Sequence, residues 1–509
     1  MFIRKKKNKS GTISVQIIDK SSGYKVHKTI GSSNDSDEIT RLIRKAQDYI
    51  YTNSGHQKVF SFETKINQVI KEFLGDLSNG QIQVIGPELI LGTLFDRLGF
   101  NVIKEELFRH IVIARLAYPG SKLKTVDYLY RYQGITVDVD QIYRFLDTLN
   151  DRYKDIVERI AFEYTKNVLG TITVVFYDMT TLYFESEDED DLRNIGFSKD
   201  GKFQNPQIML GLLVGENGFP IGYDIFEGNT FEGHTLLPVI EKMCKKYDVG
   251  KPVVIADAAL LSKENIKYLK SEGYQFILGA RIKNESMELK QMIMTKAKGI
   301  KDKEGFDITR SDGTRLIVTY STQRNKKDAH NRERGIAKLK QNIKSGRLTK
   351  NSINNRGYNK FLTLSGNVSV AIDEDKVKED GLWDGLKGFI TNTTLPIDTV
   401  VTNYRHLWQI EKAFRISKTD LRIRPIYHYR KKRITAHICV AFVAYTIYKE
   451  LERLLAQKEI TFSPKRAVEL THTMYQLEYQ LPDTNHINRT VFKMDFEQKE
   501  LYQAVFSTN

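Results

Sequence analysis

Three carboxylates stand where the sequence gives an acid no obvious structural role: Asp178, Asp257 and Glu411. Asp178 follows the apolar run 171–177 and Asp257 follows the apolar run 252–256, and both runs are typical of buried strands. Removal from water penalises a carboxylate strongly unless a positive charge meets it. Each acid is therefore a candidate for chemistry, although an Asp after a strand can also cap the next turn.

Glu411 lies in a helical pattern. It follows Leu407 by four positions and Tyr404 by seven, which predicts that all three share one helix face. A lone Glu on a helix is more often a surface charge, but the neighbouring Ile410 and Phe414 favour a site at the protein interior. We predict that the three acids converge on divalent cations, because oxygen ligands in this number suit Mg²⁺, with Mn²⁺ as a substitute.

Length and charge narrow the class of protein. The 509 residues exceed one ordinary core, so we expect two to four domains. The formal net charge is +15, which favours a polyanionic partner such as nucleic acid.

The two cysteines, Cys244 and Cys439, are too few for a disulfide framework or a zinc site and are expected in the core. No segment reaches the roughly eighteen uninterrupted apolar residues of a membrane span, and the apolar stretch 436–448 predicts a buried helix. The basic start of the chain lacks the apolar core of a secretory signal. These features predict a cytoplasmic protein without a membrane partner.

The first 165 residues show a hairpin pattern and then helical patterns. Alternating segments at 12–18 and 24–30 predict a β-hairpin region over residues 1–50. Residues 51–165 are helical with Gly and Pro punctuation, and we expect a DNA-binding region there. The stretch 107–124 could be half of a helix-turn-helix, but a packed helix and a surface turn is the simpler interpretation.

Residues 166–285 predict an α/β core. Its first three strands should form an antiparallel meander, and a helix should precede each of the last two. The five strands are expected at residues 171–177, 207–214, 220–226, 252–256 and 274–280. This order of elements is that of an RNase H-like mixed sheet, in which the first acid lies on strand one and the second follows strand four.

The third acid follows only after a long interval. Residues 286–400 hold strand patterns at 315–320 and 361–365 among basic runs, and we predict a β-containing insertion domain. Residues 401–450 should complete the core with the helix of the third acid, and residues 451–509 should form a helical tail. The predicted fold class is α/β: an RNase H-like mixed sheet interrupted by a β-rich insertion.

Six short motifs between Thr171 and Tyr429 reinforce this pattern. They are Tyr177-Asp-Met-Thr-Thr181, Gly211-Leu-Leu-Val-Gly215, Phe226-Glu-Gly-Asn-Thr230, Thr235-Leu-Leu-Pro238, Val253-Val-Ile-Ala-Asp-Ala258 and Trp408-Gln-Ile-Glu411. Together they resemble the DDE transposases of bacterial insertion sequences, in the branch with a β-strand insertion between the second Asp and the Glu. That branch carries a Tyr, Arg, Glu, Lys signature at fixed helical offsets.

Tyr404, Glu411 and Lys418 match the signature, whereas Leu407 stands at its Arg position. This departure puts one phosphate contact in doubt, and neighbouring arginines could compensate for it. Lys418 lies two helical turns after Glu411, where its ammonium could meet a phosphate, with a solvated lysine as the alternative. Tyr404 could contact DNA or simply pack, and Trp408 is expected in the core. The candidate DNA-binding residues are Tyr404, Arg405, Arg415, Lys418, Arg430, Lys431, Lys432 and Arg433.

The resemblance implies a transposase in which two Mg²⁺ ions, about 3.5–4 Å apart, serve in-line displacement at phosphorus. No covalent enzyme–DNA intermediate is expected. The implied partners are double-stranded DNA with terminal inverted repeats, target DNA, and a second copy of the chain in a homodimer, because two ends must be joined. The alternatives are a nuclease or resolvase on the same core, or a DNA-binding protein descended from a transposase without catalysis.

Overall fold

The computed structural model describes residues 1–21, 23–53, 70, 73–75, 77–78, 81–260, 262–348, 352–354, 357–365, 369–480 and 486–507. Its contacts divide the chain into two compact units. Unit 1 holds Met1–Ile82 with Glu478–Arg489, and unit 2 holds Gln83–Leu477 with Thr490–Asn509.

Unit 1 contains a three-stranded antiparallel sheet, in the order β1-β2-β3, and a helix that packs on it. β2 (Ile13–Asp19) and β3 (Lys25–Ser33) are the expected hairpin, and α1 (Ser36–Asn53) follows. Val15 and Ile17 of β2 form a small core with Ala46 of α1. The sequence interpretation missed β1 (Phe2–Lys7), because four consecutive cations interrupt its apolar pattern.

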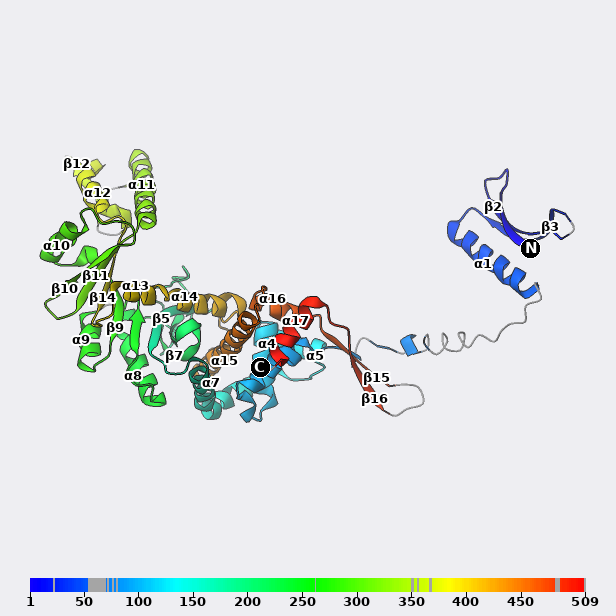
Figure 1. The fold of residues 1–509 in the computed structure, drawn as a ribbon, viewed down its shortest axis with the longest axis horizontal. Coiled ribbons are helices and arrows are strands. Elements are labelled where there is room, and N and C mark those ends of the chain that lie inside the picture. The colour runs from blue at the N-terminus through cyan, green and yellow to red at the C-terminus, as the bar shows by residue number, and fades with distance from the viewer. Residues whose placement is uncertain are drawn as a thin grey trace. The chain divides into compact units, whose positions relative to one another are not determined.

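An eight-stranded mixed sheet forms the centre of unit 2, in the order β10-β11-β14-β9-β8-β5-β6-β7 (Figure 1). The predicted antiparallel meander is β5, β6 and β7, and β8 and β9 add to it in parallel. The bounds are β5 (Val174–Tyr183), β6 (Gln207–Val214), β7 (Pro220–Glu227), β8 (Val253–Ala256), β9 (Phe276–Ala280), β10 (Gly305–Thr309), β11 (Arg315–Tyr320) and β14 (Leu386–Thr391).

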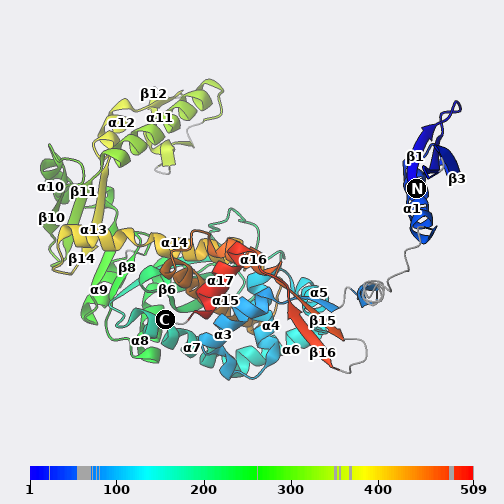
Figure 2. The ribbon, with the colours of Figure 1, turned by 45° about the vertical axis from the view of Figure 1, so that its right-hand side comes forward.

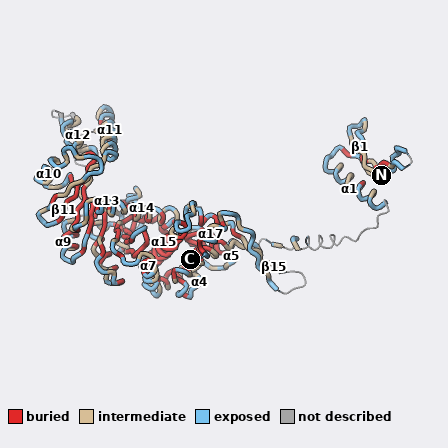
Figure 3. Tube along the Cα trace, viewed as in Figure 1, coloured by how far each residue is buried: buried red, intermediate tan, exposed pale blue. Residues whose placement is uncertain are grey.

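Helices cover both faces of this sheet. α8 (Leu236–Tyr247) and α9 (Lys263–Ser271) pack against one face. The opposite face contacts α13 (Ile397–Arg405), α14 (Trp408–Arg415) and α15 (Lys431–Gln457). Buried residues accordingly follow the strands and α15 (Figure 3).

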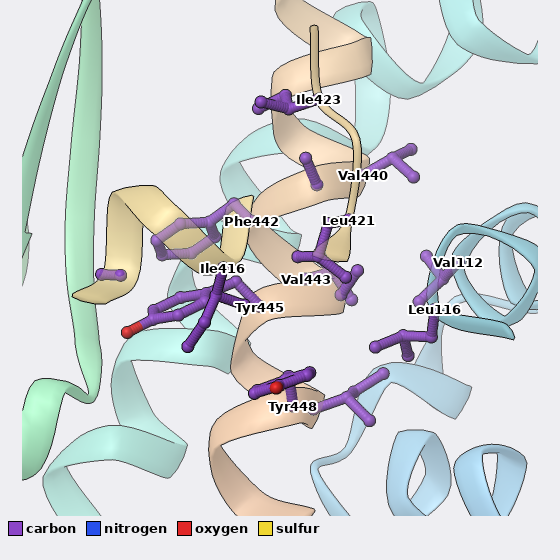
Figure 4. Packing of buried hydrophobic residues seen from close by; sticks show 14 of the residues in the cluster. Val112, Leu116, Ile416, Leu421, Ile423, Val440, Phe442, Val443, Tyr445 and Tyr448 are labelled. Carbon is purple, nitrogen blue, oxygen red and sulfur yellow. The ribbon is translucent and has the colours of Figure 1, made fainter. Parts of the chain in front are cut away.

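The predicted buried helix at 436–448 is the middle of α15. The whole of α15 is long and apolar enough to cross a membrane. However, 94% of its most apolar 18-residue stretch is buried inside the protein, so packing in the core accounts for the apolar character of α15. Figure 4 shows side chains of α15 packed against α4 and against the segment that follows α14. The labelled residues are Val112, Leu116, Ile416, Leu421, Ile423, Val440, Phe442, Val443, Tyr445 and Tyr448.

The predicted insertion does not form a separate β domain. Its strands β10, β11 and β14 extend the central sheet by pairing onward from β9. Among the described residues, α11 (Thr322–Lys344), β12 (Leu362–Ser365), β13 (Ser369–Ile372) and α12 (Glu374–Gly381) take part in a smaller cluster with its own core, beyond that end of the sheet (Figure 2). α10 (Met287–Ala297) leads from the core into this region. The domain boundary expected at residue 286 therefore lies between two strands of one sheet, because β9 precedes this residue and β10 follows it.

The described helices of the expected DNA-binding region pack around α15 in the same core. They are α3 (Thr93–Arg97), α4 (Glu106–Ala117), α5 (Lys122–Gln133), α6 (Val139–Thr148) and α7 (Lys154–Leu169). Most of α4 is buried, which supports the packed-helix interpretation of 107–124 over a groove-reading helix. Residues 54–69 of the region lie outside the described residues. The remaining strands and α-helices that the structure describes are β4 (Ile82–Val84), α16 (Pro464–Thr471), β15 (Tyr475–Gln480), β16 (Ile487–Val491) and α17 (Phe496–Phe506).

Candidate active site

Asp178 and Asp257 lie on neighbouring parallel strands. Tyr177 of β5 is opposite Ala256 of β8, so each acid takes the next position along its chain. The apolar residues two positions before each acid pack in the core on the face that contacts α14 and α15. Because side chains alternate along a strand, both carboxylates are directed to that face. The sequence suggested that Asp178 follows its strand. Because β5 continues to Tyr183, Asp178 instead lies inside the strand.

The surroundings of Asp178 favour its protonated form. The pKa of Asp178 is raised to about 6, mainly because burial disfavours the charged carboxylate. The ammonium of Lys199 and a 2.7 Å hydrogen bond from the backbone N–H of Met179 oppose this rise, while the charges of Asp257 and Glu232 add to it. Asp178 and Asp257 are thus close enough to act on each other, as the convergence hypothesis requires.

Two charged residues that the sequence did not single out complete this neighbourhood. The Nζ atom of Lys199 lies 2.9 Å from Oε1 of Glu232 and 3.8 Å from Oδ1 of Asp178. It also donates a hydrogen bond to the carbonyl of Met179 at 2.6 Å. Neither spacing nor periodicity marks these two residues, because Lys199 lies in a loop and Glu232 begins a single 3-10 turn after β7.

The helix expected to carry the third acid is broken. α13 ends at Arg405 and α14 begins at Trp408, so Tyr404, Leu407 and Glu411 do not share the face of one continuous helix. Tyr404 and Leu407 are buried, whereas Glu411 is exposed, which corrects the expectation of an interior acid.

The charges of all three acids act on the phenol of Tyr404. Its ring packs against Phe389 with the centroids 4.8 Å apart. Burial raises the pKa of the Tyr404 phenol, and the charges of Asp257, Asp178 and Glu411 raise it further. Within the described ranges, however, no three His, Cys, Asp or Glu side chains are close enough together to hold a metal ion. The structure therefore pairs Asp178 with Asp257 and leaves Glu411 outside a joint cluster.

A cavity of about 550 Å³ opens beside Tyr404. Ala258, next to the second acid, lines it together with Arg324 and Lys387 from the inserted segment. The Lys387 ammonium lies 4.5 Å from the centroid of the Tyr404 ring. Arg324 begins a basic run that the sequence marks as a candidate nucleic-acid surface, whereas Lys387 was not selected. Both residues place positive charge at the cavity wall.

The other residues that the sequence singled out around Glu411 differ in their surroundings. Arg405 and Arg415 are exposed, and Leu407 at the Arg position is buried. Trp408 is 52% exposed, so its expected place in the core was wrong. Lys418 lies in a π-helical turn, Ile416–Asp420, and is neither free nor solvated, because its ammonium contacts both carboxylate oxygens of Asp200 at 3.1 Å.

The basic cluster 430–433 begins α15 and is half paired. Arg433 donates two hydrogen bonds of 2.9 Å to the carboxylate of Asp147, and Lys432 contacts Asp151 at 2.7 Å. Arg430 and Lys431 are exposed. Arg430 and Lys431 are therefore better placed to contact the predicted DNA phosphates than Lys432 and Arg433, whose charges are already paired.

A family model described as "Transposase DDE domain" matches residues 169–447, which is more than half of the chain. The chain belongs to the DDE transposase family. The match begins before β5 and ends within α15, so Asp178, Asp257 and Glu411 all fall inside this transposase domain. The family generally uses divalent metal ions, and carboxylate oxygens such as those of Asp178 and Asp257 are suitable donors for them.

Comparison of this transposase with curated proteins gives no match. Among solved structures, one similar chain comes from a cryo-EM structure of the piggyBac transposase synaptic complex with hairpin DNA. The identity is 9%, the TM-score is 0.40, and the alignment covers 76% of this chain and 78% of that chain. A likeness this weak supports no statement about the site.

Proposed function

We propose that this DDE transposase cleaves DNA at transposon ends and joins them to target DNA in a metal-dependent reaction on an RNase H-like core. We further propose that it belongs to the insertion-sequence branch with the Tyr, Arg, Glu, Lys signature. Its partners would be double-stranded DNA with terminal inverted repeats, target DNA and a second copy of the chain.

The observation that carries the proposal is the pairing of Asp178 with Asp257. Two carboxylates lie on adjacent parallel strands, and burial raises the pKa of Asp178 to about 6 even though the ammonium of Lys199 lies beside it, so the charged form of Asp178 is costly without a metal cation. Such costs are typical of functional sites, where the charge is needed for chemistry. The succession of three antiparallel strands and two parallel strands around these acids supports the proposed core.

Asp178 and Asp257 would hold the divalent cations, and Glu411 would join them when DNA is bound. When bound, Mg²⁺ would activate an attacking water or 3′-hydroxyl and stabilise the leaving oxygen. The chain itself would position the DNA: Tyr404 lines the cavity together with Ala258, the residue after Asp257, and the ammonium of Lys387 lies over the Tyr404 ring. Both can orient a phosphate without forming a covalent bond to it.

The decisive experiment incubates the full-length protein with Mg²⁺ and duplex DNA that carries the inverted repeats flanking its coding sequence. We expect strand cleavage at the repeat ends and transfer of the freed 3′-end to a second duplex. EDTA should abolish both, and Ca²⁺ should support binding with little cleavage, because its looser coordination does not align the attack. Cleavage without transfer would favour the nuclease or resolvase alternative, and binding alone would favour the inactive one.

Three isosteric variants test the assigned ligands. Asp178→Asn, Asp257→Asn and Glu411→Gln should each lower cleavage by at least about a thousandfold while end binding stays near the parent level, because only the chemical step is lost. Glu185→Gln, a change in an exposed loop acid, is the matched control. Glu411→Gln is the most informative variant, since Glu411 lies outside the acid pair; near-parent cleavage by it would remove Glu411 from the site.

A further inference from the structure

A carboxylate occupies a pocket of positive charge close to the acid pair. Asp200 lies 3.1 Å from the Nζ atom of Lys418 and 3.3 Å from Nη1 of Arg424. The side chains of Lys418 and Asp200 are only 11% and 12% exposed, and that of Arg424 is 27% exposed. This is a shielded set of contacts and not a surface ion pair, which would contribute little.

Positive charge exceeds negative charge at this position. The guanidinium of Arg424 lies 5.6 Å from the centroid of the Tyr183 ring, and the ammonium of Lys202 lies 5.3 Å from the same centroid. Lys418 and Arg424 thus both contact the single carboxylate of Asp200, and Lys202 adds a further positive charge beside the Tyr183 ring. In addition, the Nε atom of Arg424 is buried and finds no hydrogen-bond partner among the described residues. A donor left in this way is costly, and an incoming acceptor would relieve the cost.

The residue before Asp200 connects this pocket to the acids. Lys199 contacts Glu232 and Asp178, while Asp200 contacts Lys418 and Arg424. Adjacent residues are about 3.8 Å apart along the chain. One loop segment therefore places the ammonium of Lys199 beside the acids and the carboxylate of Asp200 beside Lys418 and Arg424. The charges of both loop residues are paired within the protein.

We propose that Lys418 and Arg424 form a binding site for a DNA backbone phosphate, and that Asp200 occupies this site as an internal competitor until DNA displaces it. A planar guanidinium and an ammonium bind phosphate oxygens by the same charge-assisted hydrogen bonds that they form with a carboxylate. The inference rests on the proposed function in so far as DNA is the ligand. It adds Arg424 and Asp200 to the residues that control binding.

The test uses the full-length protein without metal and a fluorescein-labelled blunt duplex of arbitrary sequence. Anisotropy titrations over a range of salt concentrations give the affinity and its salt dependence. Asp200→Asn should tighten binding on the order of tenfold at low salt, since the phosphate no longer competes with a charge-assisted hydrogen bond. The slope of log K against log salt should steepen by about 0.9 for each additional phosphate that the protein neutralises.

Asp188→Asn is the matched control, because it removes one negative charge from an exposed position of the preceding acidic loop. Equal changes in affinity for Asp188→Asn and Asp200→Asn would overturn the proposal. The tighter binding of Asp200→Asn should also disappear in the Lys418→Met/Arg424→Gln background. Tighter binding that persists there would equally overturn it.

Arg424→Gln in the otherwise unchanged chain keeps the proposal testable if Asp200→Asn does not fold. We expect weaker duplex binding and a salt slope flatter by about 0.9, with part of the affinity restored by Arg424→Lys. An unchanged slope would refute the phosphate site. These binding measurements need no metal and no cleavage, so a protein that binds as expected but never cuts DNA would contradict the proposed function alone.

Discussion

Asp178 combines a raised pKa with a position between an acid and a cation. Its folded-state pKa of about 6 exceeds the ordinary value of 3.8, so the folded protein holds the proton more tightly than the unfolded chain does. This residue therefore favours folding fully below the unfolded value, and that contribution is lost as the pH rises through about 6. The charge that the proposed metal binding would use therefore lowers the stability of the protein at neutral pH.

This balance predicts a pH-dependent effect of Asp178→Asn. At pH 8 the variant should be more stable than the parent by about 1–3 kcal/mol, since it no longer buries a charge. Near pH 4, where the parent carboxyl is protonated, the difference should shrink toward zero. Urea unfolding at the two pH values measures it. A stability difference that is the same at both would show that burial of the charge at Asp178 is not what raises its pKa.

At the scale of elements, the break between α13 and α14 decides which side chains face the acids. It leaves Tyr404 at the end of α13 with its ring buried against β14, and it leaves Glu411 on the exposed side of α14. The close approach of α13 to the sheet depends on Gly279 of β9. A Cβ atom at this position would lie 2.4 Å from the Tyr404 hydroxyl and 2.9 Å from the backbone nitrogen of Ala258.

Gly279→Ala should therefore destabilise the protein and disturb the site. We expect a loss of about 1–3 kcal/mol, the usual cost of overpacking, and a lower cleavage rate, because Tyr404 and the turn after Asp257 must move apart. Thermal unfolding and a cleavage assay measure the two effects. Tyr404→Phe removes the crowded hydroxyl, so stability should recover in part in the double variant. No loss in Gly279→Ala would mean that α13 can shift without cost.

At the scale of the whole molecule, the two units have separate cores. The sheet of unit 1 packs on α1 through Val15, Ile17 and Ala46, while the central sheet and α15 form the core of unit 2. A unit with its own core is expected to fold independently of its neighbour. The transposase domain match lies entirely within unit 2.

Deletion of residues 1–53 should leave the folding of unit 2 unchanged. The truncated protein should unfold at the same temperature as the main transition of the full chain, because the deletion removes a complete small core and no strand of the central sheet. Circular dichroism melting followed at 222 nm, a wavelength chosen for helix content, provides the comparison. A substantially lower melting temperature would show that unit 2 depends on unit 1.

The sequence alone determined the elements whose signal is local. The continuous apolar run at 207–214 became β6, the run at 315–320 became β11, and the apolar stretch 436–448 became the middle of α15. Asp178 and Asp257 were also recognisable, because an acid at the end of an apolar run stands out without knowledge of its neighbours. These patterns depend on residues within one strand or helix, and local periodicity reports them directly.

The neighbours of these elements depend on how the whole chain folds, and local patterns do not reveal them. The inserted strands β10, β11 and β14 joined the central sheet, although nothing in their own patterns shows which edge they extend. Lys199 and Glu232 became neighbours of Asp178, and Lys418 found its partner Asp200 218 positions away. Periodicity records which face of an element is buried, whereas ion-pair partners and sheet neighbours depend on how distant segments meet when the chain folds.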